Sequence, residues 1–309
     1  MTKHLTKITD LSKQEILQIF KDAKDLQCQY LNSGQNTLYF KSKTMAMIFE
    51  KPSLRTRVSF EVAAIHLGGN AVYLTSSDIL ASGSAIKGRE SISDIAKNLE
   101  NFTDIVLART FSHETIKLLA ENSNIPVINA LCDLHHPTQT LADLYTVYDY
   151  FGGFPENLKI AFVGDGCNTA NSLMLGCDIM DIKFSIATPK GYEIPESILQ
   201  LAKKHQPEIC NEPEKAVKNA DVIYTDTWVS MGLENEFQQR LEIFKPYQVN
   251  KKLLSHAKSG VKIMHCMPAH RGEEITSDVI DGPASMVFAQ SSAKLYIAKA
   301  LLKFLTQQQ

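Results

Sequence analysis

A short polar segment, residues 49–61, combines two arginines with several hydroxyl side chains directly after an apolar run. We expect a strand to end where this segment begins and a helix to start within it, so that backbone N–H groups point at an anion. The hydroxyls of Ser53 and Thr56 and the planar guanidinium of Arg55 would then converge on one phosphate, because Arg offers a bidentate fork that Lys lacks. The alternative is that Ser53 only caps the helix while Arg55 and Arg57 lie in solvent.

Two later segments place polar groups in the same kind of position. Arg109 follows the apolar run 105–107, and His136 and Gln139 follow the run 127–128 within His-His-Pro-Thr-Gln. Parallel α/β sheets bind ligands at the carboxyl edge of their strands. Three such junctions in succession favour a site for phosphate and a carbonyl oxygen over a chance grouping.

Further candidate groups lie in the second half of the chain. Asp226 and Cys266 each follow a short apolar run, and Asn168 ends the glycine-containing segment 164–168. A dinucleotide-binding turn is a competing interpretation of this segment, but the third Gly and the acidic residue about 20 positions further on are missing. For Cys266 the competing interpretation is a buried, inert cysteine.

Short apolar runs alternate with amphipathic stretches along the whole chain. The expected strands are 45–49, 71–74, 105–107, 127–128, 159–163, 184–187, 222–224 and 261–264. The expected helices are 14–26, 59–67, 91–102, 114–121, 171–180, 195–205 and 292–305, with a capping box formed by Ser12 and Glu15 at the start of the first. This alternation predicts the α/β class, with two doubly wound parallel-sheet domains joined by interdomain helices.

The length of 309 residues suits two domains of about 150 residues each. We expect the first domain to span 1–140 together with the C-terminal helix 291–309. The second is expected to span 151–290, beginning near a Gly-Gly-Phe-Pro turn.

Composition excludes several classes of protein. The formal net charge of -2 gives no general attraction to nucleic acid or anionic membrane. No apolar run approaches the roughly 18 residues of a membrane span, and the N-terminus lacks a signal-peptide core, so a cytoplasmic location is expected. The six cysteines lack Cys-x-x-Cys spacing and the nine histidines are dispersed, so no metal site is predicted.

Several motifs together resemble one enzyme family. Ser-x-Arg-Thr-Arg at 53–57, the Arg after the third strand and His-Pro-x-Gln at 136–139 are similar to the carbamoyl phosphate signature of the aspartate and ornithine carbamoyltransferase family. The segment 226–232 resembles the Asp-x-x-x-Ser-Met-Gly loop of the ornithine branch, and 265–268 resembles its His-Cys-Leu-Pro motif with Met in place of Leu. The order and spacing match across the whole chain.

The resemblance implies transfer of the carbamoyl group from carbamoyl phosphate to the δ-amine of L-ornithine, giving L-citrulline and phosphate. The first domain would bind carbamoyl phosphate. Its contacts would be Ser53, the Leu54 backbone, Arg55, Thr56, Arg109, His136, Gln139 and Lys294, with Cys266 and Met267 added from the second domain. The catalytic residues would be Arg55, Arg109, His136, Asp226 and Cys266. The reaction passes through a tetrahedral intermediate, which needs donors on the oxyanion and cations on the leaving phosphate.

The second domain would bind ornithine through Asn168, Asp226, Ser230 and Met231. A carboxylate suits a substrate that carries amino groups. Cys266 would orient the δ-amine and help it lose a proton alongside Asp226, without a covalent intermediate, because the amine attacks directly.

Two segments depart from the family pattern. Lys294 stands where the family usually has Arg, which keeps the charge and loses the fork. The loop 78–90 carries Ser84, Lys87 and Arg89, and Lys87 is a candidate donor to a neighbouring subunit.

The resemblance further implies a homotrimer with shared active sites and no metal or organic cofactor. A transferase for putrescine or aspartate, and a non-catalytic binding protein, stay open as alternatives, as does the physiological direction of the reaction.

Overall fold

The computed structural model describes residues 2–75, 90–229 and 234–307. The chain divides into two compact units: Met1–Tyr145 with Ser292–Gln309, and Thr146–Ser291. The sequence analysis set these bounds at 140 and 291 for the first domain and at 151 and 290 for the second. None of the described helices is long and apolar enough to cross a membrane.

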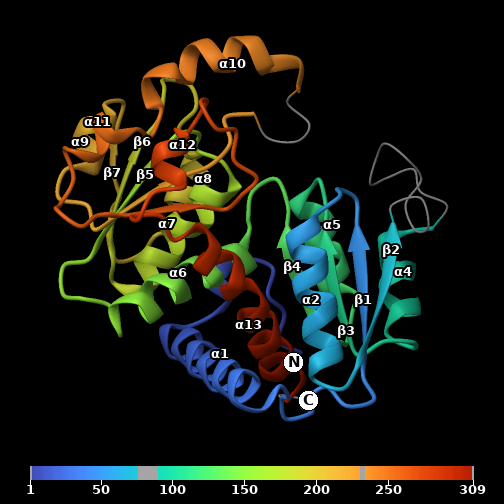
Figure 1. Ribbon diagram of the computed structural model, residues 1–309. Coiled ribbons are helices and arrows are strands. Elements are labelled where there is room, and N and C mark those ends of the chain that lie inside the picture. Colours follow the sequence, from blue (N-terminus) through green and yellow to red (C-terminus); the bar gives the residue numbers. More distant parts are fainter. Residues whose placement is uncertain (1, 76–89, 230–233, 308–309) are drawn as a thin grey trace. The chain divides into compact units, whose positions relative to one another are not determined.

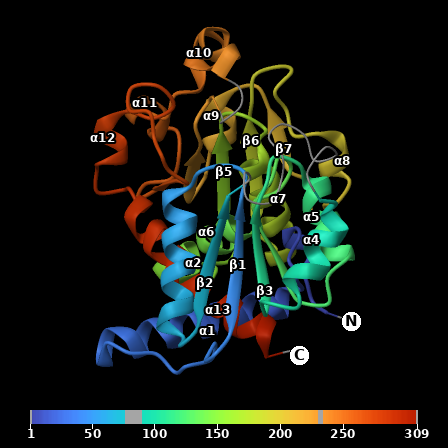
Figure 2. The same ribbon diagram turned by 90° about the vertical axis from the view of Figure 1, so that its right-hand side faces the viewer.

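The first unit is built on a parallel sheet of four strands in the order β2-β1-β3-β4 (Figure 1). The strands are β1 (Thr44–Phe49), β2 (Asn70–Thr75), β3 (Ile105–Arg109) and β4 (Val127–Leu131). Figure 2 shows α2 (Leu54–His66) on one face of this sheet and α4 (Ile92–Leu99) with α5 (His113–Glu121) on the other. Alternate residues of β1 and β3, Ala46, Ile48, Val106 and Ala108, pack with α4 and α5 in one buried cluster.

The second unit holds a parallel sheet of five strands in the order β7-β6-β5-β8-β9. These are β5 (Lys159–Val163), β6 (Lys183–Ala187), β7 (Glu208–Cys210), β8 (Val222–Thr225) and β9 (Lys262–His265). Its helices include α7 (Asn168–Met180), α8 (Glu196–Leu199), α9 (Pro213–Val217), α10 (Phe237–Phe244), α11 (Lys251–Leu254) and α12 (Ser277–Ile280). The predicted fold class, two parallel-sheet α/β domains, is confirmed.

Among the described residues, the remaining elements are α1 (Lys13–Ser33), α6 (Pro137–Phe151), α13 (Val287–Thr306) and the short 3-10 helices Ile8–Asp10, Glu234–Glu236 and Lys245–Tyr247. The capping box predicted for α1 is confirmed, since Ser12 accepts from the Glu15 N–H and the Glu15 carboxylate accepts from the Ser12 N–H. The helix continues past the predicted end and stops at Gly34, whose φ of 72° suits glycine. Both α6 and α13 contain a boundary between the units.

The helix predicted over 195–205 is wrong in its second half, because α8 ends at Leu199. The backbone N–H groups of residues 203, 204 and 205 donate instead to the carboxylate of Asp178, at 2.9, 2.9 and 2.7 Å. A buried carboxylate that accepts three N–H bonds competes with continued helix formation. The sequence pattern did not reveal this acceptor, which lies on α7.

The part of α13 in the first unit carries a lysine buried within the protein. Lys299 is 0% exposed, donates to the Asn36 side chain at 2.7 Å, and lies 4.4 Å from the centre of the Tyr30 ring. Burial lowers the pKa of Lys299 to about 8. Because its unfolded-state pKa is about 10.4, the folded state loses this proton first as the pH rises.

We therefore expect the free energy of unfolding to rise by about 2 kcal/mol more in the wild type than in a Lys299→Met variant when the pH is raised from about 7 to about 9.5. The sign follows because the unfolded chain binds more protons than the native state over this window. Urea unfolding of both proteins at the two pH values measures the change. A difference between the two proteins that stays constant with pH would show that Lys299 titrates normally.

Candidate functional site

The predicted phosphate groups lie where β1 ends and α2 begins. Ser53 is the N-cap of α2, and its hydroxyl accepts the Thr56 N–H at 3.4 Å. Ser53 thus caps the helix, and its hydroxyl hydrogen can still be donated to an anion. Arg57 lies at the surface, paired with Glu61 at 3.3 Å. Arg55 is half-buried in the first turn, where the N-terminal end of a helix favours an anion.

Leu54 is 74% exposed, so its side chain packs little within the described part of the unit. Its backbone N–H belongs to the first turn of α2, the part of the residue that was predicted to contact the phosphate. Thr56 is buried in the same turn.

Arg109 and His136 lie at the ends of the two neighbouring strands. Arg109 is the last residue of β3, pairs in register with Phe49, and is 5% exposed. His136 is 5% exposed, with its Nδ1 atom 3.4 Å from the Thr138 hydroxyl. Burial, together with the cations of Lys294 and Arg109, lowers the pKa of His136 well below its usual value. A neutral imidazole beside two cations can donate to a carbonyl oxygen.

Gln139 and Lys294 are brought together from positions 155 apart in the sequence. The Lys294 ammonium donates to the Gln139 side-chain oxygen at 2.6 Å, and the Gln139 amide donates to Asp143 at 2.7 Å. Lys294 is only 7% exposed. The replacement of Arg by Lys thus leaves a buried cation in the first unit, close enough to depress the pKa of His136.

Replacing Lys294 by Ala should reduce the free energy of unfolding by about 1–3 kcal/mol, because the buried oxygen of Gln139 would lose its donor. Urea denaturation measures this change. Lys117→Ala is the matched control, since Lys117 forms an exposed pair with Glu114 and should contribute no more than about 1 kcal/mol. Equal stability of the two variants would contradict a structural role for Lys294.

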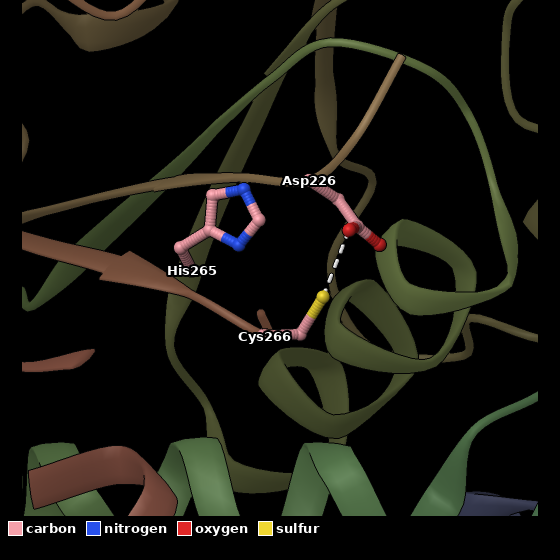
Figure 3. A group of neighbouring side chains, drawn as sticks. All are labelled: Asp226, His265 and Cys266. Carbon is pink, nitrogen blue, oxygen red and sulfur yellow. Dashed lines mark hydrogen bonds between the residues drawn. The ribbon is translucent and has the colours of Figure 1, made fainter. Parts of the chain in front are cut away.

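In the second unit, the predicted residues Asp226 and Cys266 are in direct contact. They follow the neighbouring strands β8 and β9, and the Cys266 thiol donates to the Asp226 carboxylate at 2.8 Å. Figure 3 shows the thiol pointing at the carboxylate, with the His265 ring to one side of this contact. The Thr227 N–H donates to the same carboxylate oxygen at 2.7 Å. The arrangement fixes a partly exposed carboxylate that can bind an amine.

Three residues near Asp226 were not identified from the sequence. The Cys167 thiol lies 3.8 Å from the second Asp226 oxygen, and burial, with the charges of Asp226 and Asp165, raises the pKa of Cys167 well above its usual value. Asp165 binds Arg240 at 2.7 Å, and Arg240 also donates to the Trp228 carbonyl at 3.0 Å. Burial raises the pKa of Asp165 despite this pair. Asp165 lies in the segment 164–168, but its partner is 75 residues away.

His265 holds the turn that carries Cys266 and Met267. Its Nδ1 accepts the Met267 N–H at 2.8 Å, and its Nε2 lies 3.0 Å from the Glu274 carboxylate, with both side chains fully buried. Since Nδ1 accepts a hydrogen bond, Nε2 carries the proton and donates to Glu274. The sequence analysis used His265 only as part of a motif and assigned it no contact.

Asn168 is the first residue of α7, after the N-cap Cys167, so it lies at the carboxyl edge of β5 beside β8. Ser230 and Met231 lie outside the described residues. The loop 78–90 does so as well, apart from Glu90, and with it Ser84, Lys87 and Arg89.

The sequence matches two domain profiles of one family. Residues 3–149 match the aspartate/ornithine carbamoyltransferase carbamoyl-P binding domain, and residues 156–305 match the Asp/Orn binding domain of the same family. The chain belongs to the aspartate/ornithine carbamoyltransferase family. Within this carbamoyltransferase, the groups from Ser53 to Gln139 fall in the first profile, and Asp226 and Cys266 fall in the second.

Curated relatives of this carbamoyltransferase chain cover nearly its whole length. It is 47% identical over 305 residues to the ornithine carbamoyltransferase of Methanosarcina acetivorans, with 98% of each chain covered. It is 45% identical over 310 residues to that of Bacillus subtilis, with 97% of this chain and 93% of the relative covered.

Solved structures of carbamoyltransferases share the fold. The ornithine carbamoyltransferase of Pyrococcus furiosus superposes with a TM-score of 0.90 at 43% identity, covering 97% of this chain and 96% of the relative. The anabolic enzyme of Campylobacter jejuni subsp. jejuni superposes with a TM-score of 0.91 at 37% identity, with 100% of both chains covered.

Proposed function

We propose that the protein transfers the carbamoyl group of carbamoyl phosphate to the δ-amine of L-ornithine, giving L-citrulline and phosphate. The observation that carries this assignment to ornithine is the 2.8 Å contact between Asp226 and Cys266 in the unit that matches the Asp/Orn binding domain. A carboxylate positioned by a neutral thiol attracts an amino group and can receive its proton. The relatives named ornithine carbamoyltransferase support the same substrate.

The first unit is proposed to bind carbamoyl phosphate. The first turn of α2, with Ser53, the Leu54 N–H, Arg55 and Thr56, would hold the phosphate, because the N-terminal end of a helix and a guanidinium both favour an anion. Arg109, His136 and Gln139 would contact the carbamoyl group, and Lys294 would add positive charge near them. Cys266 and Met267 are proposed as further contacts from the second unit.

The second unit is proposed to bind ornithine through Asp226, Asn168, Ser230 and Met231. The bound δ-ammonium must first lose a proton, and the Asp226 carboxylate, oriented by Cys266 and the Thr227 N–H, is the proposed acceptor. The neutral amine then attacks the carbamoyl carbon. As the tetrahedral intermediate collapses, the C–O bond to phosphate breaks and the second proton of the amine leaves on the departing phosphate. Neutral His136 and cationic Arg109 would stabilise the oxyanion, while Arg55 would stabilise the departing phosphate.

The setting of the reaction is proposed by analogy. Relatives from Pyrococcus furiosus and Campylobacter jejuni are named anabolic, which supports citrulline synthesis for arginine biosynthesis as the physiological direction. The six free thiols fit a reducing compartment such as the cytoplasm. We further propose a homotrimer with shared active sites, which sedimentation or light scattering would test.

Citrulline formation by the purified protein tests the function directly. Carbamoyl phosphate would be supplied with L-ornithine, and L-aspartate and putrescine would be run in parallel at equal concentration. Turnover selective for ornithine is the expected result. Turnover with aspartate or putrescine but not with ornithine would show that Asp226 does not select ornithine. Binding of carbamoyl phosphate without turnover of any amine would favour a non-catalytic protein.

A further inference from the structure

A second cluster of titratable side chains lies after β9, in the turn that follows the Cys266 motif. The His270 carbonyl accepts the Glu273 N–H at 2.9 Å, and Gly272 adopts a φ of 92° within this turn. The Gln248 side chain donates to the carbonyls of Gly272 and Glu273, both at 2.9 Å. The turn is therefore held rigidly, and it brings the side chains of His270, Glu273 and Glu274 together.

The carboxylates of this cluster carry oxygens without hydrogen-bond donors. Glu274 is 0% exposed, and one of its oxygens accepts from His265 at 3.0 Å and from the His270 N–H at 2.6 Å. The other oxygen, Oε2, and the Oε2 atom of Glu273 are both buried and accept no hydrogen bond from the residues that the structure describes. A buried carboxylate oxygen without a partner is costly, so a site built for a cation is the simplest physical explanation.

We propose that His270, Glu273 and Glu274 bind a divalent transition-metal ion. The His270 Nδ1 atom lies 3.5 Å from Glu273 Oε2 and 4.0 Å from Glu274 Oε2, and the three atoms all lie within 4.8 Å of one another. Ligands around Zn²⁺ lie about 2.0–2.2 Å from the ion and hence about 3.3 Å apart, so small side-chain rotations suffice. His270 is 44% exposed, which leaves a solvent side where water can complete the coordination.

The donor set selects the class of ion. One imidazole nitrogen with two carboxylate oxygens suits Zn²⁺, Fe²⁺, Ni²⁺ or Mn²⁺, whereas Mg²⁺ and Ca²⁺ prefer oxygen ligands alone. The sequence analysis searched for pairs of histidines or cysteines and therefore passed over this His-x-x-Glu-Glu spacing. The site goes beyond the proposed reaction, and metal binding can be measured without either substrate.

Another group in the same unit, Asp226 with His265 and Cys266, also has ligand atoms within 4.8 Å of one another. It is the poorer site, because both ring nitrogens of His265 already form hydrogen bonds, at 2.8 and 3.0 Å. The Cys266 proton is likewise engaged with Asp226 at 2.8 Å. A metal there would have to displace contacts that the proposed site leaves open.

Titration of the metal-free, full-length protein with ZnCl₂ in a calorimeter tests the proposal. We expect His270→Ala and Glu273→Gln each to lose one equivalent of Zn²⁺, or to bind it at least about 100-fold more weakly, and Cys266→Ser to retain it. The unfolding temperatures of the first two variants without metal should equal that of the wild type, which separates lost ligands from misfolding.

Replacement of Zn²⁺ by Co²⁺ gives an independent spectroscopic result. The proposed ligands are nitrogen and oxygen, so the Co²⁺ spectrum should lack a thiolate-to-metal charge-transfer band. Such a band, Zn²⁺ binding that survives in His270→Ala and Glu273→Gln but fails in Cys266→Ser, or no Zn²⁺ binding by the wild type would each overturn the proposal.

Discussion

Replacing Asp226 by Asn should lower kcat for citrulline formation by about 10²–10⁴-fold, the usual contribution of a positioned proton acceptor. Asn keeps the shape and can still accept from the Cys266 thiol and the Thr227 N–H, which donate at 2.8 and 2.7 Å. It lacks the negative charge that attracts an ammonium group and the basicity that removes its proton. Steady-state kinetics with varied ornithine measures both effects, since weaker attraction raises KM and lost basicity lowers kcat.

The matched control for this variant is Asp278→Asn, which changes an exposed carboxylate of the same unit that pairs with Lys251 at 3.1 Å. Its kinetics should equal those of the wild type. If Asp226→Asn also retained wild-type kcat and KM with an unchanged fold, Asp226 would have no part in binding or deprotonating the amine.

Replacing Arg55 by Ala should weaken carbamoyl phosphate binding by about 2–3 kcal/mol, which is about 30- to 150-fold in affinity. Arg55 lies in the first turn of α2, where its guanidinium adds to the helix dipole. It is half-buried, so the folded state already restricts the side chain. Direct titration with carbamoyl phosphate, or with inorganic phosphate as the simpler anion, measures the loss.

Arg57→Ala provides the control two residues further along the same helix. Arg57 pairs with Glu61 at 3.3 Å and stacks over Tyr73, 3.7 Å from the ring centre, so its charge is engaged at the surface. Its replacement should leave phosphate affinity unchanged and alter stability by no more than about 1 kcal/mol. If both substitutions lowered the affinity equally, phosphate binding would depend on the net charge of the surface and not on a specific contact with Arg55.

The pattern of strand ends predicted where several of the candidate residues lie in each sheet. Arg109 and His136 were expected at one sheet edge, and the structure places them after β3 and β4, which are neighbours. Asp226 and Cys266 likewise follow neighbouring strands. These predictions depend only on the period of the apolar runs and on the fact that parallel strands end at the same edge. The end of a helix was harder to predict, since α8 ends early where the carboxylate of Asp178 accepts the backbone N–H groups of residues 203–205.

The amino-acid sequence by itself determined the α/β class, the alternation of most strands and helices, and the edge of each sheet that carries polar groups, because these follow from local periodicity and motifs. Only the tertiary structure decided which groups pair: Lys294 with Gln139, Arg240 with Asp165, and His265 with Glu274. These pairs could not be predicted from sequence spacing, because the two residues of each pair come from different segments that only the folded chain brings together. The tertiary structure also decided which groups have shifted pKa values. Burial removes water from around His136 and Lys299, and this loss of solvation lowers the pKa of each.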